Sequence, residues 1–115
     1  MNDINSVIVE GTVIKPSVAE EPLTGTLTVT LNSERVLRRT NGVTAREVCP
    51  VPVMLRGSIA EYFKGSYKRF KKARVVGSLR SHEWEAEGRH HSALVLLAEH
   101  VELIGKTEEE NNDEV

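Results

Sequence analysis

The apolar residues of this chain recur mainly with a period of two, and this pattern limits the folds that it can adopt. The clearest case lies at 26–31, where Leu27, Val29 and Leu31 alternate with threonines. Because successive side chains of a strand point to opposite faces, the pattern predicts a strand with one buried face. Related patterns predict further strands near 4–14, 47–56, 71–82 and 91–104. The chain is therefore expected to be mainly β.

Two positions in these strands predict departures from regular pairing. Gly11 lies in the middle of the first strand, where glycine is typical of a bulge or a bend. Pro50 and Pro52 lie in the third strand and cannot donate to a ladder of hydrogen bonds. We therefore expect this part of the third strand to lie at a sheet edge or a bulge.

A short helix is predicted between the third and fourth strands. Ser58 and Glu61 have the spacing of a capping box, in which the serine and the glutamate each bond to a free amide of the first helical turn. We expect the helix over 59–64, with a continuation towards Phe70.

Turn signals separate the strands from one another. Asn41 and Gly42 form a pair favoured in tight hairpins, Gly88 marks a second hairpin, and residues 19–25 form a loop. The resulting order is strand, strand, strand, helix, strand, strand. This is the order of the OB-fold, an all-β five-stranded Greek-key barrel with one short helix. Its second and third strands and its long loops bind oligonucleotides.

The charges are divided between a basic body and an acidic end. Five of the 17 acidic residues lie in 107–115, which leaves residues 1–106 with 15 basic and 12 acidic side chains, a net charge of +3. Such an end is either simply solvated or the counterpart of a basic nucleic-acid-binding surface. We expect one OB-fold domain over residues 1–105 and a disordered acidic tail over residues 106–115.

Other signals bear on where the protein acts. The sequence has no apolar run of about 18 residues and no basic region followed by an apolar stretch at its start. Neither a transmembrane helix nor a signal peptide is therefore expected. Cys49 is the single cysteine and cannot form an internal disulfide, which fits a reducing compartment. We expect a cytoplasmic protein without membrane association.

Two groups of basic residues contain no acidic residue. They are Lys64, Lys68, Arg69, Lys71, Lys72 and Arg74 and, around the predicted hairpin, Arg35, Arg38, Arg39 and Arg46. Groups of this kind are more often solvated surface than binding sites. The second group weakens that interpretation, because it lies on a hairpin arm able to fold over a ligand. A basic groove attracts phosphates through the release of counterions.

Trp84 is the candidate for stacking on a nucleic-acid base. It is the single tryptophan and lies next to a predicted hairpin among polar neighbours. Stacking of a base on an exposed aromatic ring contributes about 1–3 kcal/mol. The alternative is a ring that covers the end of the barrel. Tyr62 and Phe63 fit the core face of the helix and are expected to be structural.

The sequence predicts neither an enzyme nor a metalloprotein. His90 and His91 are adjacent and would point to opposite faces of a strand, so they cannot both bind one metal ion. The sequence contains no glycine-rich phosphate loop and no common hydrolase motif. Cys49 lies on an apolar strand and is expected to be a core thiol rather than a nucleophile. No catalytic residue, metal or cofactor is predicted.

Three segments resemble bacterial single-stranded DNA-binding proteins, in that family's order and spacing. Residues 5–13 resemble its opening strand, N-x-V-x-L-x-G-x-L, and residues 53–61 resemble its third strand and helix start, V-V-L-F-G-K-L-A-E. Residues 73–81 resemble its V-x-I-E-G-x-L-R stretch, which a tryptophan follows. The resemblance covers about residues 4–105. It implies an OB-fold that forms a homotetramer and binds single-stranded DNA without sequence specificity in DNA replication, recombination and repair, associated with the nucleoid.

The resemblance also implies roles for individual residues. Trp84 falls on a stacking tryptophan of the family, Arg80 on a phosphate-contacting arginine, and Arg39 and Arg69 on basic positions. Together with the basic groups, this leads to a predicted DNA-binding set. The set consists of Arg35, Arg38, Arg39, Arg56, Lys68, Arg69, Lys71, Lys72, Arg80 and Trp84.

The chain departs from the family pattern at several positions. Val36, Pro50 and Arg56 stand where the family usually stacks bases on aromatic rings, so binding is expected to depend more on charge. The acidic tail resembles the segment through which the family recruits replication proteins, but it ends in Val115 rather than in Ile-Pro-Phe.

Alternatives remain open for assembly and ligand. The primosomal replication protein N group shares the OB-fold but is dimeric and poor in stacking aromatics. Residues 48–53 resemble its W-C-Q-M-P-V segment, and residues 96–104 resemble its V-L-H-A-E-Q-I-E-L-I segment. A further alternative is an OB-fold module that binds an acidic protein, and RNA is an alternative ligand. Ile8, Thr12 and Ile14, on the outer face of the first strand, are the expected subunit interface.

Overall fold

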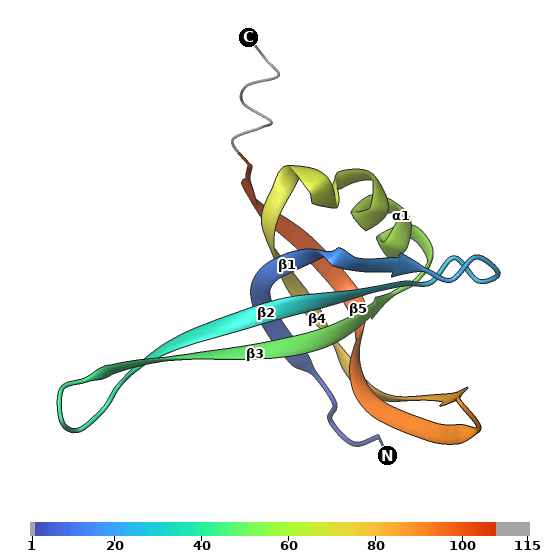
Figure 1. Cartoon of the computed structure of the whole chain (residues 1–115). Coiled ribbons are helices and arrows are strands. Elements are labelled where there is room, and N and C mark those ends of the chain that lie inside the picture. The colour runs from blue at the N-terminus through green and yellow to red at the C-terminus, as the bar shows by residue number, and fades with distance from the viewer. Residues whose placement is uncertain (1, 108–115) are drawn as a thin grey trace, which may run out of the picture.

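Five strands and one helix make up residues 2–107, the part of the chain that the computed structural model describes (Figure 1). The elements are β1 (Val7–Glu20), β2 (Leu27–Arg38), β3 (Thr44–Leu55), α1 (Gly57–Ser66), a 3₁₀ turn η1 (Tyr67–Arg69), β4 (Phe70–Ala86) and β5 (Arg89–Lys106). The predicted order of strands and helix is confirmed. The predicted acidic tail lies, beyond Thr107, outside the described residues.

The strands close into a barrel in the order β1-β2-β3-β5-β4. All neighbouring strands are antiparallel except β3 and β5, which pair in parallel at Val53 and Met54. β1 closes the barrel because it joins β4 to β2. Its first half pairs with β4 as far as Thr12, and its second half pairs with β2 from Thr12 onward. This is the predicted OB-fold architecture.

The inward side chains of all five strands form the core. The alternation predicted for β2 is observed, since Leu27, Val29 and Leu31 are buried and the threonines between them are more exposed. α1 covers one end of the barrel and inserts Phe63, which is 1% exposed and stacks on Tyr67 with ring centroids 5.3 Å apart. Burying a side chain of this size stabilises the fold by about 2–3 kcal/mol relative to exposing it.

Two glycines allow backbones to approach where side chains would block them. A Cβ on Gly11 would lie 2.6 Å from the carbonyl oxygen of Asn32 in β2. A Cβ on Gly77 would collide with the carbonyl oxygen of Leu97, beside the register shift between β4 and β5. Of the bulge or bend predicted at Gly11, the bulge is wrong, because the register shift of β1 lies between Ile14 and Ala19.

The edge predicted from the prolines of β3 is confirmed. Pro50 and Pro52 pair with Asn32 and Thr30 of β2, while β3 pairs with β5 only at Val53 and Met54. The prolines therefore lie where β3 has a neighbour on one side, so their missing amide protons leave no gap in the ladder.

The capping box predicted at the start of the helix is wrong. The helix begins at Gly57 after an extended N-cap residue, Arg56, which makes no side-chain cap bond. Ser58 therefore lies within the first turn rather than before it. Of the two aromatic residues assigned to the core, Phe63 is buried but Tyr62 is 47% exposed.

Asn5 extends the sheet beyond the last backbone pair of β1. Its side-chain amide donates to the carbonyl oxygen of Leu79 at 3.0 Å, and its side-chain oxygen accepts from the amide of Leu79 at 2.8 Å. The side chain thus takes the place of a backbone group and fastens the N-terminal segment to β4.

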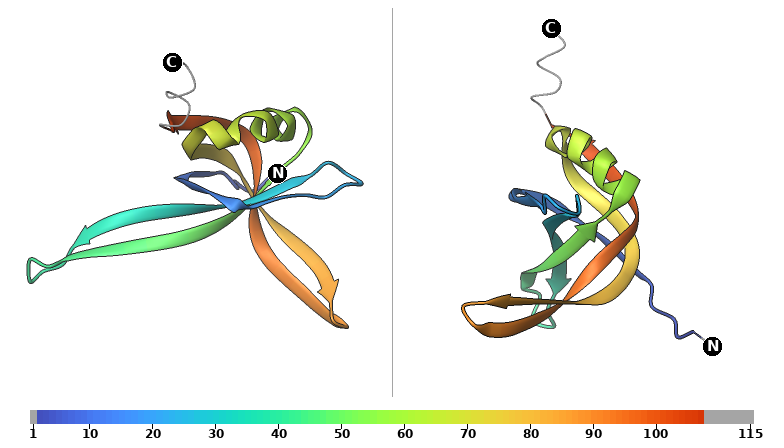
Figure 2. Two further views of the ribbon diagram at one scale, coloured as in Figure 1. Left: turned by 45° about the horizontal axis from the view of Figure 1, so that its top comes forward. Right: turned by 90° about the vertical axis from the view of Figure 1, so that its right-hand side faces the viewer.

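Two hairpins continue beyond the barrel as arms. The β2–β3 arm comprises residues 34–48 and the β4–β5 arm residues 80–95, and the two project in different directions (Figures 1 and 2). The expectation of a buried Cys49 is wrong, since this residue is exposed at the root of the β2–β3 arm. Alternation correctly assigned its face, but at this point β3 has left the barrel.

We predict that Gly77→Ala destabilises the protein, because the added methyl group would collide with the Leu97 backbone. Overpacking of this kind costs about 1–3 kcal/mol. Gly65→Ala is a matched control, because Gly65 lies inside α1 with open space around it, and alanine favours helix by about 0.5–1 kcal/mol. Urea unfolding measures both changes. Equal stability of the two variants would contradict the close approach of β4 and β5.

Candidate functional site

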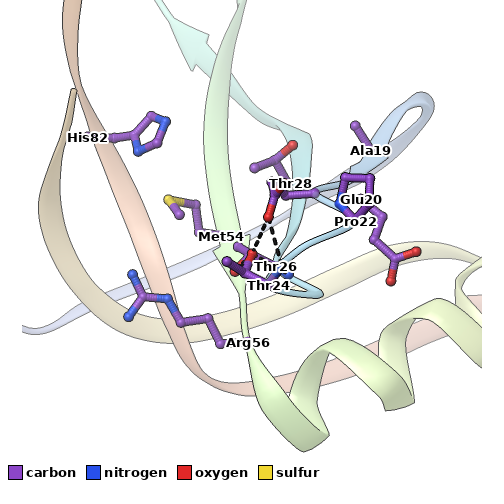
Figure 3. A pocket seen from close by; sticks show the side chains of 10 residues that line it. Ala19, Glu20, Pro22, Thr24, Thr26, Thr28, Met54, Arg56 and His82 are labelled. Atoms are coloured by element: carbon purple, nitrogen blue, oxygen red, sulfur yellow. Dashed lines mark hydrogen bonds between the residues drawn. The ribbon is translucent and has the colours of Figure 1, made fainter. Parts of the chain in front are cut away.

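A cleft of about 590 Å³ lies between the β1–β2 loop and the β4–β5 arm (Figure 3). Thr28 of β2 and Met54 of β3 line it, together with Thr26 just before β2, so it lies over the outer face of these two strands. Arg56, which follows β3, and His82 of β4 line the cleft together with the loop. A cleft at this place exposes hydroxyl, thioether, guanidinium and imidazole groups to one ligand.

The β1–β2 loop is held in shape by Glu21. Its carboxylate accepts hydrogen bonds from the amide of Leu23 at 3.2 Å and from the amide and hydroxyl of Thr24, both at 2.8 Å. The hydroxyl of Thr24, followed by these two amides, lowers the pKa of Glu21 below its usual value. The carboxylate therefore stays charged, and its oxygens are occupied by the loop itself.

The carboxylate of Glu20 is paired with a residue outside the loop. Lys64 of α1 donates to both of its carboxylate oxygens at 3.1 Å, which ties the loop to the helix. The hydrogen bond with Glu20 raises the pKa of Lys64. The pair is exposed, so it contributes little to stability, but it compensates an acidic charge at the cleft. Arg56 therefore stands at the cleft beside acids that already have partners.

Trp84 lies in a row of three rings on one face of the β4–β5 arm. The ring of His82, two residues earlier on β4, lies 5.6 Å from it, with 23° between the ring planes. The ring of His91, its cross-strand partner on β5, lies 5.4 Å away, with 16° between the planes. The three rings stand nearly parallel, and His82 at one end lines the cleft.

The two faces of the β4–β5 arm differ in charge. The pleat places Arg80 on the face of His82 and Trp84, because these residues are two positions apart. Glu83 and Glu85 lie on the opposite face, where Glu83 contacts His90 at 3.3 Å. One face is therefore basic and aromatic, and the other is acidic.

The pleat also divides the arginines of the β2–β3 arm. Arg38 lies on one face of the arm, and Arg35 lies on the other, opposite Glu47. Arg46 pairs with Glu34 at 2.8 Å. Arg39 begins the predicted turn. The backbone amide of Arg39 donates a hydrogen bond to the carbonyl oxygen of Val43 at 2.9 Å and so closes the turn. The arginines of the arm are therefore spread over both faces and the turn, and acidic residues accompany them on both faces.

The basic group at the start of β4 lies at the other end of this strand from Trp84. Lys68 and Arg69 belong to η1, and Lys71 and Lys72 begin β4. Lys72 lines a second groove of about 400 Å³, where β1 and β2 diverge. Arg74 is paired with Glu10 at 2.8 Å and with Glu102 at 3.4 Å.

The structure thus brings together only part of the predicted set. Arg56 lies at the cleft, and Arg80 and Trp84 share the adjoining face of the arm. The arginines of the β2–β3 arm and the basic residues 68–72 lie elsewhere on the surface. Val36, which stands where the family usually has an aromatic ring for stacking, is 65% exposed.

Sequence reasoning missed His82 and His91 as parts of this site. A signal was present, because His82 and Trp84 have strand spacing and His91 mirrors Trp84 across the turn at Gly88. Within residues 2–107, no three histidine, cysteine or acidic side chains come close enough to hold a metal ion. No helix among the same residues is long and apolar enough to cross a membrane.

A closed five-stranded barrel with its helix between the third and fourth strands, and with a cleft over β2 and β3, defines an OB-fold protein whose open surface lies where this fold binds oligonucleotides. The sequence model of the single-strand binding protein family matches residues 4–104. The chain belongs to this family.

Solved structures of single-stranded DNA-binding proteins have similar folds. An SSB of Plasmodium falciparum in complex with single-stranded DNA matches with a TM-score of 0.66 and 15% identity, over 90% of this chain and 96% of that one. A small single-stranded DNA-binding protein of Mycoplasma pneumoniae matches with a TM-score of 0.64 and 14% identity, over 86% and 92% of the chains. A small single-stranded DNA-binding protein of Streptomyces coelicolor matches with a TM-score of 0.62 and 15% identity, over 90% of this chain and 96% of that one. No curated protein matches the sequence.

We predict that Glu21 titrates below the usual range of a glutamate and that Thr24→Val moves its pKa back towards that range, since the Thr24 hydroxyl is the largest cause of the lowering. Because the folded pKa is lowered, the stabilisation of the loop is present above the unfolded value and is lost as pH falls through the folded one. Carboxyl NMR titration measures the pKa of Glu21 in the wild-type protein and in the variant. Thr28→Val, which removes a hydroxyl of the cleft that bonds to neither Glu21 nor Thr24, is the control. A Glu21 pKa within the usual range of a glutamate would contradict the loop geometry.

Proposed function

We propose that this protein binds single-stranded DNA without sequence specificity. The observation that carries this proposal is the position of the cleft over β2 and β3, flanked by the basic and aromatic face of the β4–β5 arm, in a chain of the single-strand binding protein family. The solved neighbour in complex with single-stranded DNA supports the same ligand class.

The chemistry of this surface fits a single strand better than a duplex. Unpaired bases can turn their faces towards aromatic rings, while the phosphates follow a basic groove. In this proposal the ring row at Trp84 stacks on bases, and Arg56 and Arg80 contact phosphates. Ring faces and phosphates are common to all sequences, so binding of this kind does not discriminate between them.

The other basic residues would contact a strand that continues beyond the cleft. Those on the β2–β3 arm are Arg35, Arg38 and Arg39, and those at the start of β4 are Lys68, Arg69, Lys71 and Lys72. Their side chains are exposed. A strand passing over several of them would gain affinity mainly from charge, as expected for a surface with few stacking rings.

The wider role follows from this activity. We place the protein in DNA replication, recombination and repair, in the cytoplasm and associated with the nucleoid, as a binding protein rather than an enzyme. Contacts with replication proteins through the acidic tail belong to the same proposal. The alternative of an OB-fold module that binds an acidic protein predicts no binding to oligonucleotides. Titration with a labelled dT oligonucleotide therefore tests this alternative as well.

We predict that affinity for a labelled dT oligonucleotide falls steeply with salt, because each neutralised phosphate adds about −0.7 to the slope of log K against log salt. Arg80→Ala should make this slope shallower by about 0.7, since it removes one phosphate contact. Fluorescence anisotropy over a salt series measures the slope.

Arg74→Ala is the control, because it removes an equal charge that is outside the predicted set and already paired with Glu10 and Glu102. An affinity that does not change with salt would contradict the electrostatic account. An absence of binding at low salt would contradict the proposed function.

We also propose a homotetramer, with a dimer as the alternative. The first half of β1 pairs with β4 alone, so its other edge has no partner strand in the described residues. Ile8, on this segment, is 69% exposed, Thr12 is exposed and Ile14 is half-buried. An unpaired edge with an exposed apolar side chain is a suitable surface for a second copy.

Sedimentation should therefore give a multiple of the monomer mass of 12.8 kDa, and Ile8→Glu should lower it by placing a charge on the edge. Ile4→Glu is the matched control, because Ile4 is 96% exposed and precedes the strand. A monomer at micromolar concentration would contradict assembly, and a stable dimer would favour the primosomal replication protein N-like alternative.

A further inference from the structure

Trp84 does not present an isolated indole on the β4–β5 arm. His82 and His91 both stack on it, and the tryptophan remains 42% exposed. A base that approaches this face from the cleft meets the imidazole of His82 first, because His82 lines the cleft. The row must therefore bind as one unit of three rings.

Two of these three rings are imidazoles. Histidine is the side chain whose ordinary protonation equilibrium lies between about pH 5 and 8. A neutral imidazole offers a base only a ring face, whereas an imidazolium offers a ring face and a positive charge to the neighbouring phosphate.

The charged groups around the row come from four parts of the chain. Arg80 lies on β4, and Arg89 lies on β5 beside His91 on the same face. Arg56 lies across the cleft after β3, with Glu20 and Glu21 of the β1–β2 segment. Both carboxylates already have partners, Lys64 for Glu20 and the loop for Glu21. The phosphates of a bound strand would therefore bring uncompensated negative charge to the two imidazoles, which favours their protonated form in the complex.

We infer that His82 and His91 are ligand-contacting residues that take up protons when single-stranded DNA binds. Together with Trp84 they form a stacking platform that becomes cationic in the complex. This inference rests on the proposed function and assigns residues that neither the family pattern nor the basic groups assign.

The opposite face of the arm provides an internal comparison. His90 lies there and contacts Glu83, near Glu85. A phosphate chain is repelled by these carboxylates, so the strand runs along the Trp84 face only. His90 therefore lies away from the inferred path of the strand, although it is adjacent in sequence to His91.

The sign of the coupling follows from linkage. The bound state holds more protons than the free state, so affinity rises as pH falls. For each imidazole that takes up a proton, the gain is up to tenfold in affinity per pH unit. Each imidazolium that meets a phosphate also steepens the dependence of log K on log salt by about 0.7.

The test measures binding of a dT oligonucleotide between about pH 5.5 and 8 at constant ionic strength. Neither thymine nor the phosphodiester titrates in this range, and the oligonucleotide carries a dye whose emission is independent of pH. The variants are His82→Gln, His91→Gln and the double variant, with His90→Gln as the matched control. Calorimetry of the wild-type protein in two buffers of different ionisation enthalpy counts the protons taken up.

The expected result is that the wild-type protein and His90→Gln bind more tightly as pH falls. The double variant should lose this dependence while it still binds at pH 8. A double variant that keeps the wild-type pH dependence would overturn the inference, and so would a calorimetric count of zero protons, which requires no variant to fold. Absence of binding by the wild-type protein at every pH would instead contradict the proposed function.

Discussion

Closure of the barrel by β1 is the constraint on which the rest of the structure depends. One strand of 14 residues must pair first with β4 and then with β2, so it has to pass close to both backbones. Gly11 permits the approach to β2, and Gly77, which pairs with Val7 of β1, permits the approach of β4 and β5. A five-stranded barrel is narrow enough for its inward side chains to fill it completely. Hence no binding site lies inside, and ligands must use the outside.

The arms follow from this closure. The barrel uses only part of β2, β3, β4 and β5, and the remaining residues continue as two-stranded ribbons with two exposed faces. A ribbon can carry different chemistry on its two faces, because the pleat sorts residues by parity. On the β4–β5 arm this sorting separates Trp84 from Glu83, although they are adjacent in sequence. The cleft then joins the selected face to the barrel surface at His82.

The sequence predicted the fold well because its evidence is local. The alternation at Leu27, Val29 and Leu31 and the turn signals depend on neighbours only. The site was predicted less well, because charge groups that are contiguous in sequence, such as the one from Lys64 to Arg74, are divided by the pleat and by ion pairs with distant acids. Burial of Cys49 was misjudged for a related reason, since alternation gives the face of a strand but not where the strand leaves the barrel. The stacking of His91 on Trp84 depends on the register of the hairpin, which has to be inferred from the turn at Gly88, whereas His82 follows from strand spacing alone.

The amide side chain of Asn5 has a practical consequence. By bonding to both backbone groups of Leu79, it holds the start of the chain against β4, next to Arg80 at the root of the β4–β5 arm. A fluorophore or tether attached before this asparagine is thereby anchored beside the β4–β5 arm rather than at a remote surface. Such an attachment would report movements of the arm directly, and tension applied through it would act first on the hydrogen bonds between Asn5 and β4.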